Sequence, residues 1–328
     1  MDPQGRIMTE NNANSASLVG PGLLLVVATA IISGVSTFVN LYAVKGTNSD
    51  AFVTVRNLAV ALLLVPIAIL GARSAHLKLR GYDYGRLLAI GFIGGAVPFL
   101  LFFHGLQLAT QAGGGATASF FYRTLFLMAT VLGVVALGER FNARVAIAAG
   151  LLLAGNLLLL SLTTPILNDG TIYVIAATAL WAVEYSVSKW TLRDLPSSTV
   201  ALGRMGFGAI FLVGYLGLTA QVSAVGALSG AQWEWVGISA VLLFAFVATW
   251  YAGLKRVDLS TAAAVLVAGF PITWMLTVTV QGSSISVDAA LGAAAVVAGV
   301  VLAIGTGLLR ATASYLASAV GSRRPGSA

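Results

Sequence analysis

The 328-residue sequence contains no cysteine and only two histidines. The absence of cysteine excludes disulfides, thiolate catalysis and cysteine-based metal sites. The two histidines lie on different segments, and the sequence lacks the H-E-x-x-H, G-x-S-x-G and P-loop patterns of metal-dependent, serine and nucleotide-hydrolysing enzymes. We therefore expect no enzymatic activity, no metal site and no cofactor.

Charged residues are also scarce. They make up 9% of the sequence, whereas a soluble globular protein carries about 25%. Hydrophobic residues make up 58%, so the chain has too little charge to cover a surface in water. The net charge of +7 is spread over short loops rather than gathered in a patch, and this excludes nucleic acid as an expected partner. The expected surroundings are a lipid bilayer.

Ten apolar segments are long enough to cross a bilayer, which takes about 20 residues each. We predict an all-α membrane protein with ten transmembrane helices and short connections. The predicted spans are residues 20–43, 51–72, 87–108, 112–137, 145–162, 171–189, 199–218, 235–254, 261–280 and 287–309. Polar tails are predicted at 1–19 and 310–328, the second of them disordered.

The Lys and Arg residues indicate the orientation, because cytoplasmic loops are enriched in them. With the N-terminus in the cytoplasm, 14 of the 18 lie in cytoplasmic segments and only Lys45 lies outside. The remaining three, Arg56, Arg123 and Arg204, lie within spans. We therefore place both termini in the cytoplasm and the protein in the cytoplasmic membrane of the cell.

The two halves of the sequence match each other. Arg56 matches Arg204 at an offset of 148 residues, and Gly138 matches Gly282 at an offset of 144. Each half holds five spans, so the second copy enters the membrane from the opposite side. This predicts two inverted five-helix repeats, 20–162 and 171–309, the arrangement of many secondary transporters.

Several short motifs give the chain a resemblance to a known family. They are 53–62 with Arg56, Leu137-Gly138-Glu139-Arg140-Phe141, Ala179-Leu180-Trp181, Ser188-Lys189, 202–208 with Arg204, Gly253-Leu254-Lys255-Arg256-Val257, Ser260-Thr261-Ala262 and Phe270-Pro271. In their order, spacing and duplication they resemble the EamA-type branch of the drug/metabolite transporter (DMT) superfamily. The resemblance covers nearly the whole chain.

This resemblance implies a secondary transporter that works by alternating access around a site between the two repeats. It also implies a small metabolite as substrate, an amino acid or a related compound, and export as the direction. One departure concerns the centre of the protein. Members usually have a proline in the fourth span as well as the ninth, and here Arg123 or Thr124 takes that place.

Two opposite charges lie within spans and are the leading candidates for a substrate site. Arg123 is central in the fourth span and could bind a carboxylate or phosphate through its planar guanidinium. Glu184, in the sixth span, could bind an amine, carry a proton or form a salt bridge with Arg123. The aromatic residues Tyr122, Trp181 and Tyr185 flank these charges and are expected to line the same site.

Three further ionisable residues have structural alternatives. Arg56 and Arg204 are repeat mates close to span ends, where they could snorkel or cap a helix, so we interpret them as structural. His104 could bind substrate or relay protons, although a lone histidine there is more often a packing residue.

The alternative to a carrier is a channel or a membrane protein that transports nothing. A channel would show a long polar stripe, and the sequence is interpreted as having isolated polar residues only. Proton coupling, exchange and homodimer formation are all compatible with the sequence, which determines neither substrate nor coupling ion.

Overall fold

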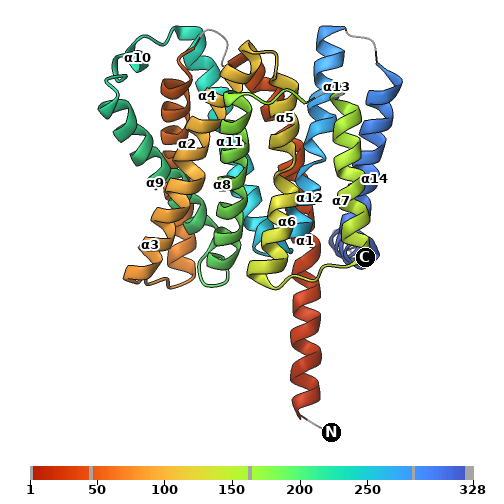
Figure 1. Ribbon diagram of the computed structural model, residues 1–328. Helices are drawn as coiled ribbons and strands as arrows, with labels where there is room; N and C mark the ends of the chain where they lie inside the picture. The colour runs from red at the N-terminus through yellow and green to blue at the C-terminus, as the bar shows by residue number, and fades with distance from the viewer. Residues whose placement is uncertain (1–2, 44–46, 162–164, 283–284, 322–328) are drawn as a thin grey trace, which may run out of the picture.

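Helices joined by short loops make up the chain, with no strand, over the residues that the computed structural model describes, which are 3–43, 47–161, 165–282 and 285–321 (Figure 1). Its helices are α1 (Pro3–Ala43), α2 (Ser49–Ser74), α3 (Gly81–Ile90), the π-helix η1 (Gly91–Ala96), α4 (Val97–Gln111), α5 (Gly115–Arg123), α6 (Leu125–Leu137), α7 (Ala143–Leu159), α8 (Asp169–Thr191), α9 (Ser197–Leu218), α10 (Ser223–Gly226), α11 (Gly230–Leu254), α12 (Leu259–Leu266), α13 (Gly269–Gln281) and α14 (Val287–Gly321).

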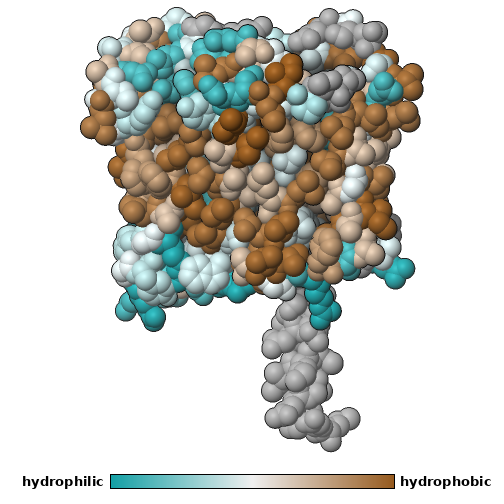
Figure 2. All heavy atoms as spheres, viewed as in Figure 1, coloured by the Kyte–Doolittle hydropathy of each residue, from teal (hydrophilic) through white to brown (hydrophobic). Residues whose placement is uncertain are grey.

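Nine helical segments among the described residues are long and apolar enough to cross a membrane. They coincide with nine of the ten predicted spans, all except the fifth. At that position lies α7, an apolar helix of 17 residues, just short of the length of the others. Figure 2 shows a broad apolar band between two hydrophilic ends, which is the surface expected of a protein that faces lipid around its middle.

Three of the predicted spans are interrupted away from their ends. The third is formed by α3, η1 and α4, so one turn of π-helix lies in its middle. The fourth is divided between α5 and α6 at Thr124, and the ninth between α12 and α13 at Val267–Ala268. Thr124 and Ala268 are 144 residues apart, which is the repeat offset found in this part of the sequence. The two breaks therefore occupy equivalent places.

Both tails differ from the expectation. Residues 3–19 continue α1 as helix, and α14 extends to Gly321 after a break at Gly305, where φ is 73°. The prediction of a disordered tail from 310 is therefore wrong up to Gly321, and Arg323 and Arg324 lie outside the described residues. The ends of α1 and α14 emerge on the same face of the bundle (Figure 1).

The helices pack in pairs that relate the two halves. α2 packs against α9, α7 against α14, and α6 against α12, which are matching spans of the two repeats. α4 packs against α8, and α1 against α11. Glycines allow the closest approach. A Cβ on Gly155 would lie 2.7 Å from the carbonyl oxygen of Gly292, so these helices touch through their backbones as small residues permit.

Candidate functional site

A cavity of about 660 Å³ lies inside the bundle, a volume typical of small-molecule sites. It reaches the ends of α1, α2 and α4 at the face opposite the two termini. Helices from both halves of the sequence form its wall. The lining residues are Ser33, Ser36, Thr37, Asn40, Thr47, Ser49, Arg56, Phe99, Phe102, Phe103, Leu106, Gln107, Thr110, Gln111, Ser119, Tyr122, Arg123, Trp181, Tyr185, Arg204, Leu243, Phe246 and Phe270.

One wall of the cavity is a polar stripe on α1. Ser33, Ser36, Thr37 and Asn40 all line the cavity, and their spacing of three and four places them on one face of a helix. The interpretation of these polar residues as isolated is therefore wrong, and their spacing in the sequence already indicates one helix face. The stripe gives the cavity one polar wall.

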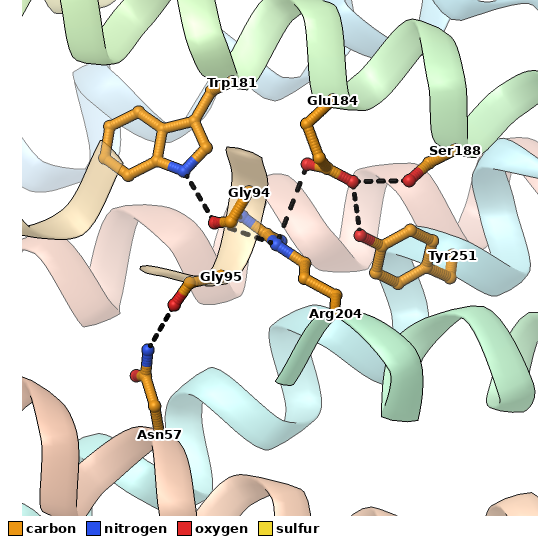
Figure 3. Close-up of polar contacts among 8 residues, drawn as sticks. All are labelled: Asn57, Gly94, Gly95, Trp181, Glu184, Ser188, Arg204 and Tyr251. Carbon is orange, nitrogen blue, oxygen red and sulfur yellow. Dashed lines mark hydrogen bonds and ion pairs between the residues drawn. The ribbon is translucent and has the colours of Figure 1, made fainter. Parts of the chain in front are cut away.

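The π-helix exposes two carbonyl groups that are bound by side chains from other helices (Figure 3). The extra residue of a π-turn displaces carbonyls from the regular α-helical bonding pattern. Trp181 Nε1 donates to Gly94 O at 3.1 Å, and Arg204 Nε and Nη2 donate to the same oxygen at 3.3 Å each. Asn57 Nδ2 donates to Gly95 O at 3.2 Å. The third span is thereby fixed to α2, α8 and α9.

Glu184 is fully buried and held beside this junction. Its Oε1 accepts hydrogen bonds from Ser188 Oγ at 2.5 Å and Tyr251 Oη at 2.6 Å. Its Oε2 lies 3.7 Å from Arg204 Nε, an ion pair longer than a hydrogen bond. Glu184 is not among the cavity-lining residues. A carboxylate in this setting balances the charge of Arg204 and is shielded from the cavity.

The expected pair of Arg123 and Glu184 does not form in this structure. Arg123 instead lies over the ring of Phe270, with Cζ 4.5 Å from the ring centroid, and its Nη1 is buried without a hydrogen-bond partner. Arg123 ends α5 at the break in the fourth span and lines the cavity. The position of Arg123 in the fourth span agrees with the prediction, but its predicted pairing with Glu184 does not form, because Arg204 approaches Glu184 from α9.

Arg56 and Arg204 also line the cavity, and neither snorkels to a membrane surface, because they are only 2% and 3% exposed. The Arg56 Nε and Nη2 atoms both donate to Asn57 Oδ1 at 3.2 Å. The guanidinium also faces the Phe99 ring, 5.2 Å from its centroid. Snorkelling is therefore wrong for both residues, whereas the other structural alternative, binding a carbonyl group of a neighbouring helix, is what Arg204 does at Gly94 O. Because both also line the cavity, they join Arg123 as candidate binding groups.

Aromatic side chains form the deeper part of the cavity wall. Tyr122 and Trp181 lie with ring centroids 5.6 Å apart, and Phe102 lies 4.8 Å from Tyr122 and 5.4 Å from Trp181. Tyr185 also lines the cavity. These three predicted residues, Tyr122, Trp181 and Tyr185, are thus brought together. His104 is not: it is exposed and contacts the ring of Tyr173 away from the cavity.

At the face opposite the cavity opening, the two halves are joined by Glu139. Gly138 ends α6 in the left-handed conformation with φ of 72°, which directs the chain so that Glu139 reaches α12. The Glu139 carboxylate accepts from the backbone nitrogens of Leu259 at 2.5 Å and Ser260 at 2.9 Å. It therefore caps α12, where a negative charge is favourable.

Lys189 supports the same closed end. Its Nζ donates to Leu254 O at 2.7 Å and Val257 O at 2.6 Å, at the carboxyl end of α11. Both motifs in which these residues occur, Leu-Gly-Glu-Arg and Ser-Lys, carried the family resemblance. Glu139 joins the end of α6 to the start of α12 across the two halves, and Lys189 joins α8 to the end of α11 within the second half.

Comparison with known proteins decides the family. The EamA-like transporter family matches the chain twice, over residues 20–161 and 168–305. The chain belongs to the EamA-like transporter family. It is therefore a multi-pass membrane protein of a transporter family within the DMT superfamily, as the sequence motifs predicted.

Solved structures support the fold of this EamA-like protein. One crystal structure is similar to it with a TM-score of 0.68, over 88% of this chain and 98% of the other, at 20% identity. At that identity the likeness concerns the fold alone. No curated protein matches the chain in sequence, so the substrate must be inferred from the cavity itself.

Proposed function

We propose that this EamA-like protein is a secondary transporter that exports a small metabolite, an amino acid or a related compound, across the cytoplasmic membrane by alternating access. The observation that carries the proposal is the cavity, which is lined by helices of both halves and opens at one face. At the other face Glu139 and Lys189 bind backbone groups of the second half. A site open to one side only is what a carrier needs.

The proposed architecture is ten spans in two inverted repeats, 20–162 and 171–309, with α7 as the fifth span. Matching helices pack against each other in the pairs α2–α9, α6–α12 and α7–α14. Figure 1 supports the inversion, since α2 and α9 run in opposite directions. Gly138 and Gly282, matched in sequence, both end a helix with positive φ, at 72° and 66°.

The proposed orientation places both termini in the cytoplasm. The loops at the face of the termini carry most of the Lys and Arg, as expected of cytoplasmic loops. In that orientation the cavity opens to the outside, and Glu139 closes the cytoplasmic side. Transport would require the Glu139 contacts to break while the outer ends of the helices come together.

The cavity favours exchange over proton coupling. None of its lining residues is an aspartate, glutamate or histidine, and these are the side chains that usually carry protons in transporters. Glu184 lies behind the cavity wall, where it is bound by Arg204, Ser188 and Tyr251. Exchange of one metabolite for another needs no titrating group.

Counterflow in proteoliposomes tests the proposal. The purified protein is reconstituted, one unlabelled compound is loaded inside, and uptake of the same labelled compound is measured over panels of amino acids, organic acids, nucleosides, sugars and polyamines. A carrier accelerates uptake when loaded and saturates, whereas a channel does neither. Protein-free liposomes are the control. Absence of loading-dependent uptake for every class would contradict the proposed function.

A further inference from the structure

We propose that the cavity selects a small organic anion with a flat apolar body, and that Arg56, Arg123 and Arg204 bind its acidic group. The inference rests on the proposed transport function and specifies its substrate class. It narrows that function from amino acids and related compounds to those with a net negative charge.

Charge is the first support. Three guanidinium groups line the cavity and no carboxylate does. Glu184 offsets one of them from behind, through its ion pair with Arg204. The site therefore carries a surplus of about two positive charges in a region of low dielectric, where unpaired charge is costly. An anion removes that surplus, and a zwitterion leaves it.

Glu184 is not available for the amine of a zwitterion. Its side chain has no exposed surface, and it accepts two hydroxyl hydrogen bonds. Both of these bonds are to Oε1, and Oε2 is buried without a hydrogen-bond partner among the described residues at 3.7 Å from Arg204 Nε, so a substrate amine would have to pass the Arg204 guanidinium to reach it. A zwitterion that places its carboxylate on Arg123 and its amine on Glu184 thus lacks its second partner in this structure.

Unpartnered donors are the second, independent support. The Nη1 atoms of Arg123 and Arg204 are buried and make no hydrogen bond with the described residues. The whole Arg204 residue is 97% buried. Buried donors without acceptors are rare in folded proteins because they lose the hydration of their N–H groups. A carboxylate or phosphate supplies the missing acceptor oxygens and matches the planar guanidinium.

The aromatic wall indicates the shape of the rest of the ligand. The rings of Phe102, Tyr122 and Trp181 form a mutual cluster, and Phe270 lies against both Tyr122 and Arg123. These rings line the cavity together with the three arginines. A flat apolar group can pack on them while its acidic group faces the guanidiniums.

The test is a series of small compounds that share one phenyl ring and carry different charged groups. Isothermal titration calorimetry is performed on the full-length protein in detergent with 3-phenylpropionate, phenylsuccinate, phenylalanine and 2-phenylethylamine. The two anions are expected to bind at least about tenfold more tightly than phenylalanine, since one charge-assisted contact is typically worth that factor, and the amine is expected not to bind. Tighter binding of phenylalanine or of the amine, or no binding of either anion, would overturn the inference.

A set of variants locates the effect. Arg123→Gln is expected to weaken 3-phenylpropionate about tenfold or more, and Arg123→Lys, which keeps the charge, to weaken it less. Arg140→Gln removes the same charge from an exposed position in the loop after α6, outside the cavity lining, and should bind as wild type. An Arg123→Gln protein with unchanged melting temperature and unchanged anion affinity would contradict the assignment. If that variant does not fold, the ligand series on wild type decides.

Counterflow with the same compounds separates this inference from the proposed function. Anion binding without loading-dependent uptake of any compound would refute transport and leave the anion site in place. Counterflow of phenylalanine with no counterflow or binding of the anions would refute the anion site and leave transport in place.

Discussion

At the scale of single residues, the site depends on how three arginines of the cavity wall are compensated. Arg204 donates to Gly94 O and pairs with Glu184, and Arg56 donates to Asn57. Arg123 has only the face of Phe270. The three therefore differ in what their removal leaves behind. Loss of Arg204 strands a buried carboxylate, and loss of Arg123 strands nothing.

We predict that Arg204→Gln lowers the stability of the folded protein by roughly 3–5 kcal/mol, the cost of leaving one member of a buried ion pair without its partner. Melting temperature and folded yield in detergent measure the effect. The double variant Glu184→Gln/Arg204→Gln should recover a large part of the loss, because both charges are then gone. An Arg204→Gln protein as stable as wild type would show that the pair contributes little.

At the scale of elements, the π-helix brings the third span against α9 without intervening side chains. A Cβ on Gly95 would clash with the backbone oxygen of Arg204 and approach Gly208 Cα to 3.0 Å. Both neighbours are backbone atoms, which cannot rotate away. The position of Arg204 in the cavity therefore depends on a glycine one helix away.

We predict that Gly95→Ala strongly lowers folded yield and melting temperature, since α9 must move to admit the methyl group. Gly85→Ala is the matched control. Gly85 lies on α3 of the same span with nothing within 4 Å of its Cβ position, so alanine should stabilise it by up to about 1 kcal/mol through helix propensity. Equal melting temperatures for the two variants would contradict the proposed close packing.

The Glu139 cap is a second feature of this scale, because one side chain of the first half holds the start of a helix in the second. Removing an N-cap costs about 1–2 kcal/mol. That energy stabilises the conformation closed at this face. Weakening it should raise the population that is open there.

We predict that Glu139→Ala speeds the labelling of a cysteine placed at Ala264, which is 5% exposed on α12. The measurement uses an impermeant thiol reagent on inside-out vesicles, and the natural absence of cysteine gives a clean background. Glu139→Gln keeps an acceptor oxygen and should give an intermediate rate. Identical rates in all three proteins would mean that the cap does not control the opening.

At the scale of the whole molecule, the proposed topology predicts which loops face outside. Asn48 and Ser229 precede α2 and α11 at the face of the cavity opening, and Ser74 and Ala143 lie at the opposite face. All four are exposed. Cysteines at the first two positions should react with an impermeant reagent in intact cells, and those at the second two only after permeabilisation. Labelling of Ser74→Cys in intact cells would reverse the orientation.

The sequence by itself determined the class of the protein, nine of its spans and its family. These properties can be read from short stretches of the sequence, one at a time. Insertion into lipid depends on the apolar content of each 20-residue segment, and the repeat and its motifs are visible without coordinates. The polar stripe from Ser33 to Asn40 is also visible in the sequence, through its spacing of three and four residues.

Only the tertiary structure decided the partners of the buried charges. The sequence shows that Arg123, Arg204 and Glu184 all lie within spans, but it does not show which arginine pairs with Glu184. That choice depends on how the helices are rotated and how closely they approach each other. Those in turn depend on the π-turn at Gly91–Ala96 and on glycine contacts between helices. Such features arise from packing between segments over 80 residues apart in the chain, as in the bond from Trp181 to Gly94. The pattern of residues along the sequence does not contain information on that packing. It therefore predicted which charged residues lie in the membrane but not which of them pair.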